Sequence, residues 1–598
     1  MSYLDRVRLH FSGQFQADPS TVNNDPTHYD NATFLPEYQL PQTDTSANGW
    51  WNPDGSASWR LVDCHVTRVC YVDGSSTNDV AADPVVGMRI MDANKRVAGK
   101  LVDLDPQQQM VSQIWGLLVR LTDGVNDAFS GPFERASFSD LWMRSAPVGT
   151  KMPLGVFYQS VLAPVLWGDD RKSRFLRELR AAAKHDMLSI KFNLDGYDSD
   201  STSATFTLGR IVGTIGPADD DEPRQFVLGR HLGGTTRLMT FMPCVVDKKA
   251  RRILADFGNS LPTVAPGGNL APVLGALTLG YLDASKTFQS LGDVPYQTPN
   301  FYESTAGIVE LPADRDLTND ELKALASNPV AVASNGKTLL QENIDGLYVR
   351  ADNFTYRLSP GDTAEVELWA TQYGELQDGA RINVSFDPTG LQQSNGPAVA
   401  TPTTALTGFA ASTPIVAKKG RATLKLTAHD PDNPRGYIDG QVYGVRPIPQ
   451  AVVGNPPGSW VDPWDFISVL VFDAFEAAEP TWFGEMQPIF TQYGNLYPLM
   501  DRLIDLTDYD AIAANVQVLS FVFALPITDP NSMPVTRDLS AAKRAAILKW
   551  LNTPGPDGKP LKGTEAPQPE AAAKRHVPTT EAVTSELHAI KSGLRKES

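Results

Sequence analysis

The sequence predicts a mainly β protein, in which an antiparallel sandwich- or barrel-like N-terminal region and an immunoglobulin-like β module precede a small C-terminal helical subdomain. Three observations favour this fold class. Short runs of alternating apolar and polar residues dominate up to about residue 445, and amphipathic helical stripes follow after about residue 480. The third is a composition of 42% hydrophobic and 20% charged residues over 598 positions, which is typical of a globular protein with about three or more domains.

The first domain, residues 1–340, is expected to be antiparallel β structure with a covering helix. Apolar residues at positions 7, 9 and 11 alternate with more polar ones, which predicts a half-buried strand with His10 on its polar face. Apolar runs that flank polar loops predict two hairpins, and residues 171–185 predict a helix over an open face of the sheet. The hairpins pair residues 187–194 with 205–215, and residues 238–246 with 252–257.

The second domain, residues 341–445, contains short alternating runs separated by Pro-Gly-Asp, Asp-Gly and Lys-Lys-Gly turns. That spacing predicts an immunoglobulin-like β-sandwich, although the Cys–Trp–Cys framework of true immunoglobulin domains is missing. Residues 446–552 then combine a Pro-rich connection with the helical subdomain. There Pro498 should kink one amphipathic helix, and Asp508 and Ser540 are placed to cap two others.

The last segment, residues 553–598, is predicted to be a flexible tail because it is rich in Pro, Gly, Ala and Lys. Its end carries a narrow apolar stripe at helical spacing, which predicts a helix that docks onto a partner or frays. The stripe consists of Val583, Leu587, Ile590 and Leu594.

The net charge is strongly negative: 52 Lys and Arg against 69 Asp and Glu give −17. A field of this sign disfavours nucleic acid and anionic membrane surfaces as partners. The start of the chain lacks the apolar run of a signal peptide, and no segment has the 18 or more apolar residues of a membrane-spanning helix. With only three cysteines, the sequence favours a reducing, cytoplasmic location. On one regular strand Cys64 and Cys70 would share a face, roughly 20 Å apart, as inert buried thiols.

Common catalytic motifs are missing from the sequence. It contains no phosphate-binding G-x-x-x-x-G-K-[ST], no G-x-G-x-x-G after a strand, no H-E-x-x-H, no C-x-x-C and no G-x-S-x-G. The E-x-x-H pair of ferritin-like di-metal bundles is also missing. Whether the chain is an enzyme is therefore left open.

Two histidines stand beside charged residues. Asp25 is close enough to His28 to orient its imidazole as a ligand, and a surface turn at Asp25-Pro26 is the alternative. His10, beside Arg8, belongs either to a polar pocket or to a solvated strand face. The acidic loops 195–200 and 219–222 lack the spacing of a calcium loop, which favours solvated turns.

Three segments resemble the iminophenyl-pyruvate dimer (chromopyrrolate) synthase family of the violacein and rebeccamycin pathways. They are MSYLDRVRLHFSGQFQADPSTVNNDP at the start, MPCVVDKKARRILADFGNSLP in the middle, and LYPLMDRLIDLTDY with DPNSMPVTRDLSAAKRAAILKWL near the end. They stand in the family's order and span residues 1 to about 552. The resemblance covers the N-terminal half of the longer family members, whose second half is ferritin-like.

This resemblance implies iron or haem and the oxidative coupling of two imines derived from an aromatic amino acid. Carried over by position, it offers Arg8, His10, Asn24 and Asp25 as weak catalytic candidates and His28 as a haem-ligand candidate. The ferritin-like half is not present in this sequence. The hypothesis is therefore a counterpart of the N-terminal half that works with a ferritin-like or oxidase partner.

A hypothesis from another class is a non-catalytic β-rich binding or scaffold protein that docks a partner through its C-terminal tail. The sequence leaves open the substrate, the presence of haem or a metal, and whether the chain forms a homo-oligomer.

Overall fold

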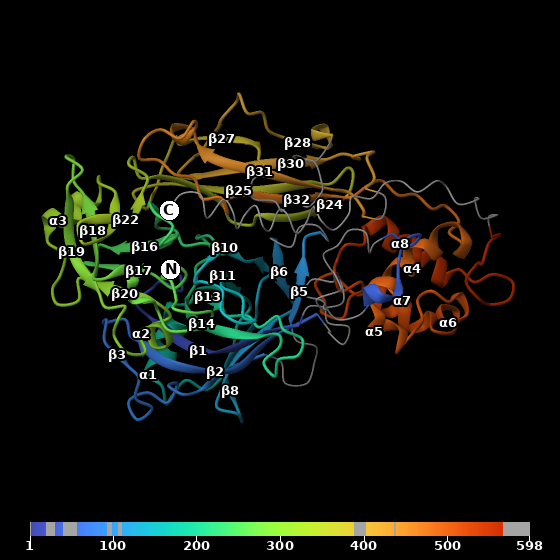
Figure 1. The fold of residues 1–598 in the computed structure, drawn as a ribbon, viewed down its shortest axis with the longest axis horizontal. Helices are drawn as coiled ribbons and strands as arrows, with labels where there is room; N and C mark the ends of the chain where they lie inside the picture. Colours follow the sequence, from blue (N-terminus) through green and yellow to red (C-terminus); the bar gives the residue numbers. More distant parts are fainter. Residues whose placement is uncertain are drawn as a thin grey trace.

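The computed structural model describes residues 2–18, 30–39, 57–92, 99–105, 111–387, 402–435 and 438–565. Within these residues the protein is mainly β, with curled or nearly closed antiparallel sheets and few, small helices, which confirms the predicted fold class. The helices from α4 onward gather at one end of the molecule, beside the β units (Figure 1).

The first β unit is one curled sheet, which has 14 strands in the part of the chain that the structure describes. Its main path runs β10-β11-β13-β14-β1-β2-β4-β7-β8-β12, and an isolated bridge between Phe133 and Leu162 links its two halves. The strands are β1 (Arg8–Ala17), β2 (Ser58–Cys70), β3 (Ser76–Thr77), β4 (Arg89–Met91), β5 (Gly99–Asp103), β6 (Ser112–Trp115), β7 (Leu118–Thr122), β8 (Asp127–Pro132), β9 (Ala136–Ser137), β10 (Ser139–Met143), β11 (Leu154–Leu162), β12 (Leu166–Trp167), β13 (Leu188–Asp195) and β14 (Leu208–Pro217). The pairing of β13 with β14 confirms the first predicted hairpin.

Helix α1 (Arg174–Ala182) packs on the core of this curled sheet, as predicted from residues 171–185. It begins after Ser173, whose side chain accepts a hydrogen bond from the backbone N–H of Leu176. Phe175 and Leu179 are fully buried among the side chains of the sheet. The helix therefore completes the core that the strands alone leave open.

Strand β2 contains two register shifts that reverse which residues face the core. The core side chains are first at odd positions, then at even positions from Cys64, and at odd positions again from Val69. Asp63, at the first shift, has a left-handed backbone with φ of 49°. The prediction that Cys64 and Cys70 share a face is therefore wrong: Cys64 lies in the core, whereas the Cys70 thiol is 3.8 Å from His10 Nε2 on the other face.

The second β unit is an antiparallel sheet with 8 strands among the described residues, in the order β19-β18-β21-β22-β15-β16-β17-β20. The pairing of β16 with β17 confirms the second predicted hairpin. The elements of this unit are β15 (Arg230–Gly234), β16 (Met242–Asp247), β17 (Arg252–Asp256), η3 (Pro272–Leu274), β18 (Leu277–Leu282), β19 (Phe288–Val294), α2 (Phe301–Thr305), β20 (Ile308–Leu311), α3 (Asn319–Leu325), β21 (Val330–Ser334) and β22 (Lys337–Glu342).

The third unit is a sandwich of two sheets that share one apolar core, each with five strands among the residues that the structure describes. One sheet runs β23-β25-β30-β28 with β26 beside β25, and the other runs β24-β32-β31-β27-β29, in which β24 and β32 are parallel. The elements are β23 (Leu347–Ala351), β24 (Thr355–Leu358), β25 (Thr363–Gln372), β26 (Glu375–Leu376), β27 (Arg381–Phe386), η4 (Thr403–Ala405), β28 (Leu406–Thr407), β29 (Ile415–Val416), β30 (Arg421–Ala428), β31 (Gln441–Pro449), η5 (Gln450–Val452) and β32 (Ile467–Val471).

Two predicted domain boundaries need correction. The boundary at 340/341 falls inside β22, and the boundary at 445/446 falls inside β31. The sequence also predicts one last strand over residues 466–472, and β32 confirms it: this strand returns to the sandwich and pairs with both β31 and β24.

The helical subdomain is built around two stacked tryptophans, Trp482 and Trp550, with ring centroids 5.9 Å apart. Its predicted caps are confirmed: Asp508 accepts from the N–H of Asp510, and Ser540 accepts from the N–H of Lys543. The kink predicted at Pro498 is observed as a full break, because α4 ends at Leu496 and α5 begins at Pro498. The helices are η6 (Trp482–Met486), α4 (Gln487–Leu496), α5 (Pro498–Asp501), α6 (Tyr509–Ala514), α7 (Val516–Ala524) and α8 (Ala541–Asn552).

The predicted flexible tail from residue 553 is wrong for its first part. The Leu561 carbonyl accepts hydrogen bonds from the Trp482 backbone N–H and the Trp550 indole, so this segment closes over the helical core. The short helix η2 (Pro36–Gln39) contacts the same subdomain through Gln39, which donates to carbonyls of α4. None of the helices in the described ranges is long and apolar enough to span a membrane.

Candidate functional site

Two of the predicted site residues, Arg8 and His10, lie together on β1 and are buried. The Arg8 Nε donates to His10 Nε2 at 3.3 Å, and the other ring nitrogen, Nδ1, lies 2.9 Å from Thr214 Oγ1. Because a guanidinium can only donate, Nε2 is the acceptor and Nδ1 carries the proton that is donated to Thr214. The interpretation of a solvated strand face is therefore wrong for His10, which is buried, although Gln14 farther along the same face of β1 is exposed.

The His10 imidazole is neutral, because burial and the positive charges of Arg8 and Arg68 hold its pKa well below the usual value. Both ring nitrogens have partners within the protein. Haem or metal ligation by His10 would need one of these hydrogen bonds to break, so the residue does not fit the role of an iron ligand. Its chemistry is that of a neutral hydrogen-bonding group inside a β interface.

The other predicted site residues cannot be placed. Asn24, Asp25 and His28 lie outside the described residues, and so does the apolar stripe of the tail. That stripe is Val583, Leu587, Ile590 and Leu594. These assignments stay predictions.

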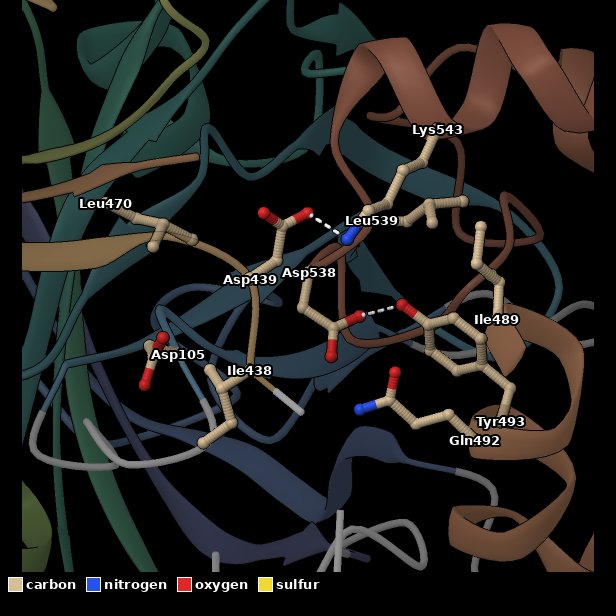
Figure 2. A pocket seen from close by; sticks show the side chains of 10 residues that line it. All are labelled: Asp105, Ile438, Asp439, Leu470, Ile489, Gln492, Tyr493, Asp538, Leu539 and Lys543. Carbon is tan, nitrogen blue, oxygen red and sulfur yellow. Dashed lines mark hydrogen bonds and ion pairs between the residues drawn. The ribbon is translucent and has the colours of Figure 1, made fainter. Parts of the chain in front are cut away.

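The candidate site that the structure adds is a polar cavity where three parts of the chain meet. Its wall combines the end of β5, the segment before β31, strand β32, helix α4 and the start of α8, as Figure 2 shows. The lining residues are Asp105, Ile438, Asp439, Leu470, Ile489, Gln492, Tyr493, Asp538, Leu539 and Lys543. Segments more than 400 residues apart in sequence thus contribute polar side chains to one enclosed space.

The centre of this cavity is the Asp538 carboxyl group. It accepts hydrogen bonds from the Tyr493 hydroxyl at 2.8 Å and from Thr536 Oγ1 at 2.5 Å. Burial raises the pKa of Asp538, and the Asp105 carboxylate adds to the rise, while the two hydroxyl donors oppose it. A carboxyl group in this setting can carry a proton at a higher pH than an exposed aspartate and release it to a base in the cavity.

Two ion pairs hold the cavity walls together. Lys543 Nζ lies 2.9 Å from Asp439 Oδ2, and the guanidinium of Arg435 contacts the buried Asp105 carboxylate at 2.5 Å. Lys543 sits in the first turn of α8, so the Ser540 cap also fixes where its side chain starts. The pairs join the helical subdomain to the sandwich, and the sandwich to the first sheet.

The cavity volume is about 40 Å³. A buried water needs roughly 10–15 Å³ on this measure together with two to four polar partners, so the space suits a few water molecules. An aromatic imine does not fit without movement of the helical subdomain. The arrangement as it stands can hold water and a proton between Asp538, Tyr493 and Lys543.

Sequence reasoning missed most of this site. Tyr493 is predicted as part of an apolar helical stripe and Lys543 as a solvent-facing residue, and Asp538 carries no local motif. The one available signal is chemical: Tyr493 is a polar-tipped residue on a stripe otherwise suited to a core, and a buried phenol needs a partner.

A second group of carboxyls is buried where all three β units meet. Asp140 of β10 and Asp462 share a hydrogen bond, and Asp465 pairs with Arg350 of β23 at 3.2 Å. Tyr348 donates a hydrogen bond to Asp465 as well. Burial and the Asp465 charge raise the pKa of Asp140 to about 7, although Arg350 opposes this. Two adjacent buried carboxyls avoid the repulsion between like charges when they share one proton.

The acidic loop 219–222 brings three carboxylates close enough for a cation, among the residues described. However, Asp219 pairs with Lys184, and Asp220 lies 3.1 Å from His185 Nδ1. For the loop 219–222 these contacts agree with the solvated turn that the sequence favours. For the loop 195–200 that prediction is wrong, because Asp195 and Asp198 are buried.

Comparison with known proteins adds no relative. No family model matches the chain, and no curated protein matches it.

Proposed function

We propose that this chain is a component of an oxidative biosynthetic pathway, the counterpart of the N-terminal half of an iminophenyl-pyruvate dimer synthase. In this role it acts with a ferritin-like or oxidase partner on imines derived from an amino acid. Iron or haem, where present, supplies the oxidation, and this chain supplies a docking surface and a proton-handling cavity.

The observation that carries the proposal is the outer surface of α7. This helix, Val516–Ala524, contains no charged residue. Leu519 and Phe523 are buried in the helical core, yet Val518 and Phe521 remain 54% and 64% exposed. Val518 and Phe521 thus form an exposed apolar pair on this helix, and exposed apolar surface of this kind indicates a protein interface. A ferritin-like partner, which is itself helical, offers a surface of matching chemistry.

The cavity supports the same role. The oxidative coupling of imines releases protons, and a buried carboxyl with a raised pKa beside a lysine is suited to accept or deliver them. The cavity lies between the helical subdomain and the β units, so a partner that moves the helical subdomain would change its access.

The test is co-expression with the ferritin-like or oxidase proteins encoded by neighbouring genes. The expected result is formation of a coupled product from the imine of an aromatic amino acid when both proteins are present, with a tenfold or greater loss when this chain is omitted. Equal product formation by the partner alone would contradict the proposal. Metal analysis and an absorption spectrum of each purified protein would show which of the two carries iron.

A second candidate function is a non-catalytic scaffold that docks a partner through residues 579–598. The apolar stripe of that segment favours it. Deletion of residues 579–598 should then abolish association with the partner while thermal unfolding stays unchanged. Undiminished association after the deletion would exclude docking through the tail and leave α7 as the contact.

A further inference from the structure

A groove opens at one end of the sandwich, between its two sheets, with a volume of about 390 Å³. The wall on one side comes from β23 and β25, and the wall on the other side comes from the start of β27, the end of β31 and η5. The lining residues are Leu347, Tyr348, Val349, Ala370, Gln372, Gln377, Gly379, Ala380, Arg381, Pro449, Gln450 and Ala451. A space of this size accommodates a small organic molecule.

The groove has an apolar floor. Val349 and Ala370 belong to the buried core of the sandwich and stand opposite each other on β23 and β25. Pro449, which is also buried, closes the floor from the facing sheet. An apolar group bound in the groove would lie against these side chains and be partly removed from water.

The rim of the groove is polar and carries one cation. Three glutamines and Arg381 line it, and the Arg381 Nε donates to the Gln450 side-chain oxygen at 2.5 Å. That contact fixes the guanidinium at the mouth. Among the described residues, no carboxylate forms an ion pair with Arg381, and none of the lining residues is Asp or Glu.

This charge pattern differs from the rest of the molecule. The chain has 69 acidic residues and a net charge of −17, and its other polar cavity contains three aspartates. A groove without acidic residues, beside an arginine that lacks a described carboxylate partner, selects for negative charge. Arginine is also the side chain best suited to bind a carboxylate through two parallel hydrogen bonds.

We infer that this groove is a binding site for a small amphipathic anion, whose apolar ring lies on Val349, Ala370 and Pro449 and whose carboxylate pairs with Arg381. The site is separate from the polar cavity and from the α7 surface. It therefore goes beyond the proposed function and stands or falls independently of it.

The experiment compares two probes of equal shape, 1-naphthylacetate and its neutral amide 1-naphthylacetamide, by titration calorimetry on the full chain. The carboxylate is expected to bind about tenfold more tightly than the amide, because a charge-assisted hydrogen bond is stronger than a neutral one. In Arg381→Gln this preference should vanish, and in Arg381→Lys part of it should remain. The matched control is Lys425→Gln, which removes one positive charge from an exposed position of β30 and should leave the preference intact.

A third variant, Ala451→Trp, tests the location. Ala451 is exposed at the edge of the groove, so a larger side chain there can fill the space without disturbing the core. Both probes should lose binding in this variant. The inference is overturned if the unmodified chain binds neither probe at millimolar concentration, if acid and amide bind equally, or if Arg381→Gln or Ala451→Trp leaves binding unchanged.

Discussion

Buried ionisable residues are the feature that most distinguishes this chain at the scale of single residues. Lys191 and Tyr3 both contact the buried Asp256 carboxylate across the interface between the first two β units. Removing one partner from such a group leaves an uncompensated charge, which costs more than the pair contributes. These residues fix how the β units dock, and they explain why substitutions there should affect stability before function.

The Asp140–Asp462 pair makes the stability of the protein pH-dependent. The pKa of Asp140 is raised in the folded state to about 7, so the folded protein binds a proton more strongly than the unfolded chain. Stability from this group is fully present below the unfolded pKa of about 4 and is lost as the pH rises to about 7. The amide in Asp140→Asn cannot ionise, so this variant should lose less stability as the pH rises. The melting temperature of the variant minus that of the unmodified protein should therefore increase from pH 4 to pH 8.

The measurement is thermal unfolding at pH 4, 6 and 8. Asp293→Asn, on the exposed strand β19, is the matched control and should follow the unmodified protein. If the melting temperature of Asp140→Asn differs from that of the unmodified protein by the same amount at all three pH values, the two carboxyls do not share a proton.

At the scale of elements, regular patterns were predictable and irregular ones were not. Hairpins with apolar runs on both sides of a polar loop, and caps such as Asp508 and Ser540, follow from local chemistry. The two register shifts in β2 do not, because a bulge adds one residue without changing composition, and one residue exchanges the two faces of a strand. The error on Cys64 and Cys70 has this origin.

The cap of α8 gives a direct test at this scale. Ser540→Ala removes the hydroxyl that accepts from Lys543 N, and the expected loss of stability is about 1 kcal/mol. Ser540→Gly removes the same hydroxyl but should cost only a few tenths, because glycine exposes the N-terminal N–H groups to water. Hydrogen exchange of residues 541–544 provides the readout. Unchanged exchange in Ser540→Ala would show that the cap does not hold this turn.

At the scale of the whole molecule, the polar cavity depends on three segments that are distant in sequence. Asp105, Asp439 and Asp538 each follow or precede a regular element and share no motif. Only the packing of the helical subdomain beside the β units brings them together (Figure 1). Fold class and individual elements were therefore within reach of sequence patterns, whereas the site was not, because tertiary contacts decide it.

The same packing leaves α7 with an exposed apolar face. The proposed docking of a partner on this face can be tested directly. A partner that covers Val518 and Phe521 would bury their exposed apolar surface. Each Å² buried in this way contributes roughly 25 cal/mol to the free energy of binding. A charge at position 521 would oppose that burial, whereas a charge at the exposed Gln517 adds the same charge to the same helix without altering the apolar pair.

Sedimentation velocity of this chain mixed with its ferritin-like or oxidase partner is the most direct measurement. The account predicts a faster-sedimenting complex with the unmodified chain and with Gln517→Glu, and its loss with Phe521→Glu, at unchanged melting temperature of the free protein. A complex that forms equally well with Phe521→Glu, or no complex with the unmodified chain, would contradict it.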